Sequence, residues 1–342
     1  MWTLEQLVAL SLLDTLPRKD LVARLRGEDP HLAEAAAPFV GRAREACGRA
    51  AQLGIAPLAC TDDRFPAALL TLDDCPPVLW FKGDAACLAM PAAAIVGSRT
   101  ASAVALETAS RLASDLAQRG VLVVSGLARG VDSSAHRGAL TGGGPTAAVL
   151  GSGLGRIYPP EHGRLAQEIA ARGVLLSEYE TDAVPLAFRF PQRNRLISGL
   201  SRVIVVIEAS EKSGSLITAS WALAQGREVM AVPGNVLSGR NRGGHALIRD
   251  GAKIVETADD ILEGFTLDSG SSFAAAVVAN PCTSVGSGDP ALAALDRGRA
   301  YDLDELASAL GLQAAGLLTR LSDWELRGLV RRLDGGRFML AS

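Results

Sequence analysis

One repeating pattern constrains the fold of this chain more than any other feature. From Ala92 to about residue 256, short apolar runs alternate with glycine-containing turns and amphipathic stretches of helical periodicity. Such alternation is typical of a parallel sheet whose two faces are both covered by helices. We therefore predict an α/β fold, a doubly wound parallel sheet of six or seven strands with short loops. The expected strands are "AAAIVG", "VLVVSG", "TAAVLG", "VLLSEY", "RVIVVIEAS", "EVMAVPG" and "AKIVE".

The stretch before this pattern is helical in character. Residues 1–70 carry apolar side chains at helical spacing, interrupted by breakers, in "LEQLVALSLL", "KDLVARL" and "HLAEAAAPFVGRAREACGRAAQLG". We expect an all-helical module here, similar to SAM or helix-hairpin-helix domains. The next segment, "DDCPPVLWFKGD", has two prolines before an aromatic-rich run, which indicates a turn and an edge strand. It opens the sheet domain, which we place at residues 71–266.

The C-terminal part has a different composition. Residues 267–288 are rich in Ser, Gly and Ala and carry few charges, which is typical of a flexible linker. Residues 289–342 then show a helix with Asp302 as N-cap, a turn at Gly311, a second helix and a Gly-Gly hairpin that returns along residues 337–340. This order predicts a winged-helix module. Its second helix has one arginine against two acidic residues, which favours a protein partner over duplex DNA and leaves both open.

Composition excludes several classes of protein. The 342-residue chain is 48% hydrophobic and 21% charged, which is typical of a globular protein. Its apolar runs fall far short of the roughly 20 residues of a membrane span, and its N-terminus lacks the basic start of a signal peptide. We therefore expect a cytoplasmic protein with no membrane span. The five cysteines form no CxxC pair and the four histidines show no metal spacing, so we expect neither a metal nor a cofactor.

The distribution of charge says more than its total. The formal net charge of -3 would argue against a nucleic-acid partner, but phosphate binding relies on clustered Lys and Arg rather than on the average. Between Leu186 and Lys253, ten basic residues stand against four acidic ones. We interpret this segment as an anion-binding face.

Unusual polar residues follow four of the expected strands. In an open parallel sheet the carboxyl ends of the strands meet at one edge, where loops and helix N-termini bind ligands. Hydroxyls, glycines and arginines from four loops at one edge favour a phosphate-type ligand. The loops are "GSRT" from Gly97, "SGLARGVDSSAH" from Ser125 with Gly130 in its middle, "FRFPQRNRLISGLS" from Phe188 and "SEKSGSLITAS" from Ser210.

Other ligands find little support in the sequence. The stretch "LGSGLG" from Leu150 follows a strand, but it lacks the third glycine and the later acidic residue of a dinucleotide fingerprint. The GxxxxGK[ST] motif of a P-loop is also missing. Asp132, at a helix start, is a candidate acid catalyst, although we favour a structural role as an N-cap or as a partner of Arg129.

The ordered motifs resemble those of the DNA-processing protein A, or Smf, family. The matching segments include "AIVGSRTAS", "VVSGLARGVDSSAHRGAL", "AVLGSGLGRIYPPEH", "FRFPQRNRLISGLS" and "VIVVIEASEKSGSLITASWALAQGREVMAVPGN", and they cover about 160 residues. The resemblance implies an extended Rossmann-like fold, a homodimer through that domain and no catalysis. It also implies a single-stranded DNA binder that protects incoming DNA in natural transformation and loads RecA recombinase onto it.

The same resemblance implies which residues line the DNA pocket. They are Ser98, Arg99, Ser125, Gly126, Arg129, Phe190, Arg193, Asn194, Arg195, Gly214, Ser215 and Thr218. Arginines and backbone N–H groups would hold phosphates, while Phe190 or Phe188 would stack a base. Which of the arginines at 189, 193 and 195 contacts phosphate stays open. The alternative function is a Rossmann enzyme that binds or hydrolyses a nucleotide, but the chain lacks the PGGxGTxxE glutamate motif of phosphoribohydrolases.

Overall fold

The computed structural model describes most of the chain up to Thr266 and a few residues near the C-terminus. The chain divides into two compact units, Met1–Asn280 and Pro281–Ser342. The residues described are 2–13, 18–27, 29, 31–266, 301, 306, 330–333 and 337–340.

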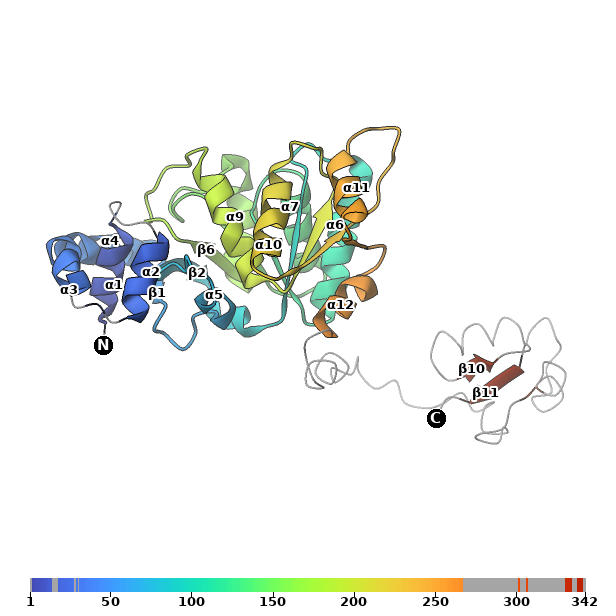
Figure 1. Cartoon of the computed structure of the whole chain (residues 1–342), viewed down its shortest axis with the longest axis horizontal. Coiled ribbons are helices and arrows are strands. Elements are labelled where there is room, and N and C mark those ends of the chain that lie inside the picture. The colour runs from blue at the N-terminus through green and yellow to red at the C-terminus, as the bar shows by residue number, and fades with distance from the viewer. Residues whose placement is uncertain are drawn as a thin grey trace. The chain divides into compact units, whose positions relative to one another are not determined.

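A nine-stranded sheet forms the centre of the first unit (Figure 1). Its strand order is β1-β2-β6-β5-β4-β3-β7-β8-β9. The seven strands expected from the sequence are all present as β3 to β9, and they pair in parallel. The strands are β1 (Ala56–Ala59), β2 (Val78–Gly83), β3 (Ala92–Gly97), β4 (Leu122–Ser125), β5 (Thr146–Val149), β6 (Val174–Ser177), β7 (Val203–Ile207), β8 (Glu228–Ala231) and β9 (Lys253–Ile254).

Helices cover both faces of this sheet, as the doubly wound pattern predicts. Side chains alternate between the faces along each strand. Val123 and Val205 therefore join the core under one helical layer, while Val124 and Val206 join the core under the other. The first layer contains α6 (Ala103–Gln118), α7 (Val131–Thr141) and α12 (Ala258–Thr266). The second contains α5 (Ala67–Leu70), α9 (Arg189–Leu200), α10 (Gly214–Ala224) and α11 (Arg242–Arg249).

The N-terminal module is not wholly helical. Strand β1 lies inside residues 1–70 and pairs antiparallel with β2, so this stretch contributes to the sheet. Strand β2 pairs with β6 on its other side, which corrects the expectation that it is the edge; β1 is the edge and tolerates Pro57 there. The module's helices share a core with β1, β2 and α8 (Gly163–Arg172). They are α1 (Leu4–Ser11), α2 (Arg18–Arg26), α3 (His31–Ala36) and α4 (Val40–Gln52).

The second unit contains a hairpin. Strand β10 (Val330–Leu333) pairs antiparallel with β11 (Arg337–Leu340), which confirms the expected return strand. Tyr301 also bridges to Phe338. The linker at 267–288 and the two helices of the predicted winged helix lie outside the described residues.

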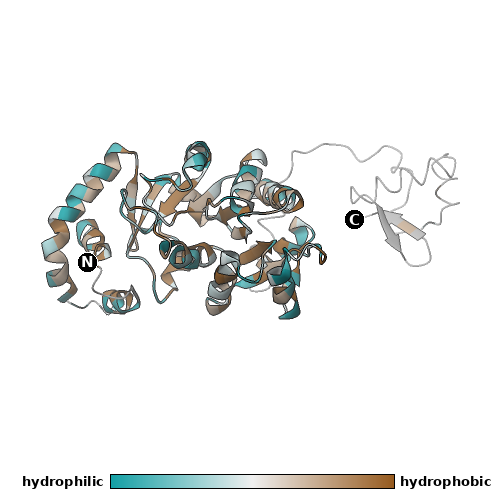
Figure 2. Ribbon diagram, turned by 90° about the horizontal axis from the view of Figure 1, so that it is seen from above, coloured by the Kyte–Doolittle hydropathy of each residue, from teal (hydrophilic) through white to brown (hydrophobic). Residues whose placement is uncertain are grey.

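The order of the strands reverses next to β3. From β3 the chain steps outward through β4, β5 and β6, and then returns to place β7 on the other side of β3. The loops that follow β3 and β7 diverge at this switch point and leave a crevice at the carboxyl edge of the sheet. The central strands are hydrophobic and the surrounding helices carry hydrophilic stretches (Figure 2). No helix of the described part is long and apolar enough to cross a bilayer.

Candidate functional site

A cleft of about 390 Å³ opens at the switch point. The loops after β3 and β7, the first turns of α9 and the N-terminus of α10 form its walls. Eight residues expected from the sequence line it together: Ser98, Arg99, Phe190, Arg193, Asn194, Gly214, Ser215 and Thr218. The other five expected residues lie outside this lining: Ser125, Gly126, Arg129, Gly130 and Arg195.

An exposed arginine and an aromatic ring form one wall of the cleft. The loop after β3 leaves the Arg99 side chain exposed, and its guanidinium lies 5.7 Å from the centre of the Phe190 ring. Tyr158 also packs against Phe190, with the two ring centroids 5.4 Å apart. A cation beside a half-buried ring offers both a phosphate contact and a stacking surface.

The N-terminus of α10 forms the opposite wall. Ser213 is its N-cap, and its Oγ accepts a hydrogen bond from the Ser215 N–H at 3.3 Å. The Asn194 amide donates to the Gly214 carbonyl at 3.2 Å, which fixes α9 against this turn. A helix start of this kind presents backbone N–H groups and a partial positive charge, which suit an anion.

The N-terminus of α6 is occupied by an acidic side chain instead. The Ser102 N–H donates to the Glu208 carboxylate at 2.8 Å, and the Ser102 hydroxyl donates to the other oxygen. In a dinucleotide-binding Rossmann fold the pyrophosphate lies at this helix start. Glu208 therefore takes the place that an anion would have at the start of α6, whereas no carboxylate of the cleft lining belongs to the start of α10. Sequence reasoning did not single out Glu208.

Arg193 lies in the floor of the cleft rather than on its surface. Its side chain is buried, and its Nη1 donates to the carbonyls of Gly126, at 2.9 Å, and of Val149. Burial lowers the pKa of Arg193 to about 10, so the side chain remains charged at neutral pH. Burial raises the pKa of the neighbouring Asp132, which accepts the Gly126 N–H at 3.1 Å. Arg193 and Asp132 thus tie the loop after β4 and the last residue of β5 to α9.

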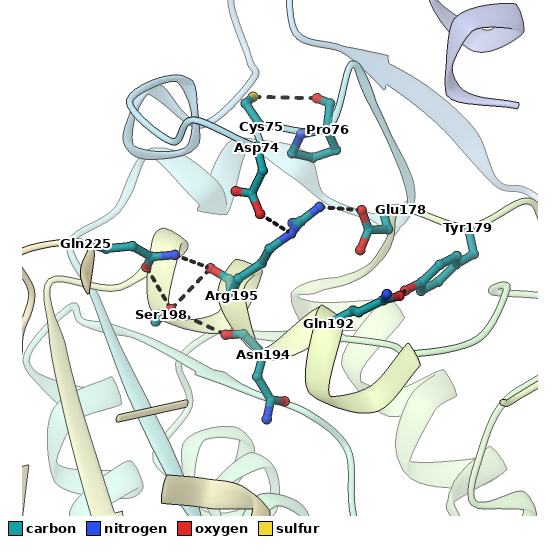
Figure 3. Close-up of polar contacts among 10 residues, drawn as sticks. All are labelled: Asp74, Cys75, Pro76, Glu178, Tyr179, Gln192, Asn194, Arg195, Ser198 and Gln225. Atoms are coloured by element: carbon teal, nitrogen blue, oxygen red, sulfur yellow. Dashed lines mark hydrogen bonds and ion pairs between the residues drawn. The ribbon is translucent and has the colours of Figure 1, made fainter. Parts of the chain in front are cut away.

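Arg195 faces away from the cleft. Its guanidinium is buried between two carboxylates, Asp74 at 2.8 Å and Glu178 at 2.6 Å. Figure 3 shows this side chain pointing towards Asp74 and Glu178, whereas Asn194 points in the opposite direction. Arg195 therefore joins α9 to the segments before β2 and after β6.

The loop after β4 contributes through its shape. Ser125 is buried and donates to the Ile95 carbonyl at 2.7 Å. Gly130 has a φ of +77°, and a Cβ there would lie 2.2 Å from the Ser98 carbonyl oxygen. A Cβ on Gly126 would overlap the Arg193 guanidinium in the same way. Arg129 is exposed and pairs with Glu161, so Asp132 is the partner of Arg193 and not of Arg129.

Several lining residues were not among those expected from the sequence. Thr100, Pro191, Ser210 and Ile217 line the cleft. All four belong to loops and helix starts that the sequence did identify. The sequence did not predict that these particular side chains face the cleft. Within the described residues, no three His, Cys, Asp or Glu side chains are grouped so as to hold a metal ion.

Comparison with known proteins identifies the family. Residues 57–266, more than half of the chain, match the model of the DNA recombination-mediator protein A family. The chain belongs to this family. It is 43% identical over 204 residues to the DNA processing protein DprA of Streptococcus pneumoniae, covering 60% of this chain and 72% of that protein. It is 39% identical over 278 residues to the protein Smf of Escherichia coli, covering 80% and 74% of the two chains.

Two solved structures of DNA processing protein A resemble the fold. The X-ray structure of the Streptococcus pneumoniae protein is 34% identical with a TM-score of 0.67, and the match covers 77% of this chain and 98% of that one. A structure of the Helicobacter pylori protein, described for its single-stranded DNA binding mode, is 31% identical with a TM-score of 0.56 and covers 62% and 95%. The mixed α/β architecture of the described sheet is therefore that of the DNA recombination-mediator family.

Proposed function

We propose that the chain binds single-stranded DNA in the cleft beyond the carboxyl ends of β3 and β7 and has no catalytic activity of its own. It protects incoming DNA in natural transformation and homologous recombination, and it delivers that DNA to RecA recombinase. We also propose that the chain acts as a homodimer formed through the sheet domain. The single-stranded DNA binding mode described for the Helicobacter pylori relative supports the first part of this proposal.

The pairing of Arg99 with Phe190 opposite the start of α10 carries the proposal. Proteins that bind single strands combine cationic contacts to phosphates with aromatic rings on which bases stack. Arg99 and the α10 N-terminus supply the first kind of contact, and Phe190 supplies the second. A base can stack in this way only when it is free of its complementary strand, so the arrangement favours single strands over duplex.

An enzyme acting on nucleotides is the less favoured function. Asp132 is the one carboxylate lining the cleft of the described part, and it is held by the Gly126 N–H and the charge of Arg193. A carboxylate with these partners serves the packing of the loops.

Competition between single and double strands tests the binding proposal. We expect an oligo-dT strand to bind more tightly than a duplex of equal length across a salt series, in a gel-shift titration. Equal or weaker binding of the single strand would contradict the proposal. A second assay tests the delivery of DNA to RecA. Adding the chain should speed RecA filament formation on single strands coated with a single-strand-binding protein. An unchanged rate would contradict RecA delivery but not the binding of single strands.

A further inference from the structure

A second groove, of about 760 Å³, lies beside α9 and has no assigned role. Its lining comes from the end of α1, the segment after β6, the first turn of α9 and Trp221 on α10. It is larger than the cleft and combines aromatic, cationic and acidic side chains. The side chains that matter for its chemistry are Tyr179, Phe188, Arg189, Gln192 and Trp221.

Two helices contribute residues to both the groove and the cleft. On α9, Phe190 and Asn194 line the cleft, whereas Arg189 and Gln192 line the groove. On α10, Ile217 lines the cleft and Trp221, one turn later on the same face, lines the groove. Helices α9 and α10 lie side by side (Figure 1). A strand that leaves the cleft past the first turn of α9 therefore enters the groove.

Flat side chains are among those that line the groove. The Phe188 ring is 58% exposed, although burial would stabilise it. The Arg189 guanidinium lies 4.6 Å from the Tyr179 ring centre and 5.9 Å from that of Phe188. Its Nη1 donates to the Val184 carbonyl at 2.8 Å, which holds it in place. Tyr179 in turn donates to Gln192 at 3.4 Å (Figure 3). Bases stack on such aromatic and guanidinium planes.

The acidic residues of the groove are already paired. Asp74 and Glu178 both contact Arg195, and Glu180 contacts Arg42 and Arg49. Arg189 has no carboxylate partner among the described residues. The groove can therefore accept a phosphate backbone, with Arg189 as the cation that meets it.

We propose that this groove is a second stacking subsite for the single-stranded DNA that leaves the cleft, with Phe188 and the Arg189–Tyr179 pair as its platforms. The inference rests on the proposed binding of single strands in the cleft. It adds that the contact surface continues over α9 towards the N-terminal module, so strands too short to leave the cleft do not reach it.

Oligonucleotide length separates the two sites. We expect Phe188→Ala to weaken binding of a dT strand of about 15 nucleotides by about 5-fold to 100-fold in fluorescence anisotropy, and to leave a strand of about 4 nucleotides unchanged. Phe188→Trp should restore the affinity because it keeps a stacking plane. The salt dependence should not change in Phe188→Ala, since stacking releases no counterions, whereas Arg189→Ala should lower the slope by about one.

Two control variants show whether the groove proposal alone is wrong or whether DNA binding in the cleft is wrong as well. Leu237→Ala removes a side chain that is 92% exposed on the loop after β8, and it should bind both lengths as the wild type does. Arg99→Ala should weaken both lengths. If Arg99→Ala weakens both but Phe188→Ala affects neither, or both equally, the groove proposal is wrong and the cleft stands. If Arg99→Ala changes nothing, the proposed function itself fails.

Discussion

Three arginines within seven residues of the sequence have three different environments. Arg189 lies over Tyr179 at the groove, Arg193 is buried against backbone carbonyls, and Arg195 is buried between two carboxylates. The sequence predicted that this stretch belongs to the site but left the role of each arginine open. Residue type and spacing could not separate them, because the difference depends on which face of α9 meets the sheet and which meets the N-terminal module.

Arg195 gives the sharpest prediction at the scale of a single residue. Arg195→Ala leaves Asp74 and Glu178 without their partner, and removing one member of a buried ion pair costs about 3–5 kcal/mol. We expect that loss in urea unfolding. The fraction that folds should keep its affinity for a strand of about 4 nucleotides within about twofold, because Arg195 lies outside the cleft lining. A stable Arg195→Ala protein with weakened binding of this short strand would show that Arg195 acts as a ligand contact in the cleft.

At the scale of elements, the loop after β4 shapes the cleft through its glycines. Gly130→Ala places a Cβ against the Ser98 carbonyl at a φ that disfavours side chains, so we expect a loss of about 1–3 kcal/mol of stability. DNA affinity should also fall, because the Arg99 loop must shift. Gly163→Ala is the matched control: nothing lies within 4 Å of its Cβ position, and alanine favours the helix there. Equal stability of the two variants would mean that the loops after β3 and β4 can move apart without a loss of stability.

The elements themselves were largely predictable. Strands β3 to β8 appear in the sequence as buried apolar runs, because a parallel sheet covered on both faces requires them. The edge strand β9 has two exposed residues. Strand β1 was missed: "APLA" has four residues, includes a proline and shows no periodicity. The cleft was predicted at the correct edge, since the carboxyl ends of parallel strands always meet there. Glu208 was missed because its role depends on a contact with Ser102, over a hundred positions away.

At the scale of the whole molecule, one buried histidine makes folding depend on pH. His136 is buried with its Nδ1 2.8 Å from Thr146 Oγ1, and burial lowers its pKa from 6.5 to about 3. In the unfolded chain His136 becomes protonated below about pH 6.5, whereas in the folded chain it stays neutral down to about pH 3. The free energy of unfolding therefore falls as the pH falls through this window. At pH 5 the loss is about 2 kcal/mol.

Replacing this histidine isolates its share of the acid sensitivity. We expect His136→Gln to be less stable at pH 7.5 but to lose about 2 kcal/mol less than the wild type on going to pH 5. Denaturant titrations at the two pH values measure the loss of stability in each protein. Parallel losses in the two proteins would mean that His136 is protonated in the folded state.

A comparison of two arginines tests whether single-stranded DNA binds in the cleft beyond the carboxyl ends of β3 and β7. Arg99 lines the cleft, whereas the side chain of Arg164 on α8 is 91% exposed and pairs only along its own helix with Glu168. We measure the affinity for oligo-dT by anisotropy as a function of salt for Arg99→Ala and Arg164→Ala. We expect Arg99→Ala to bind more weakly, with a salt slope reduced by about one, and Arg164→Ala to match the wild type. Equal affinities and slopes for the two variants would contradict binding in the cleft.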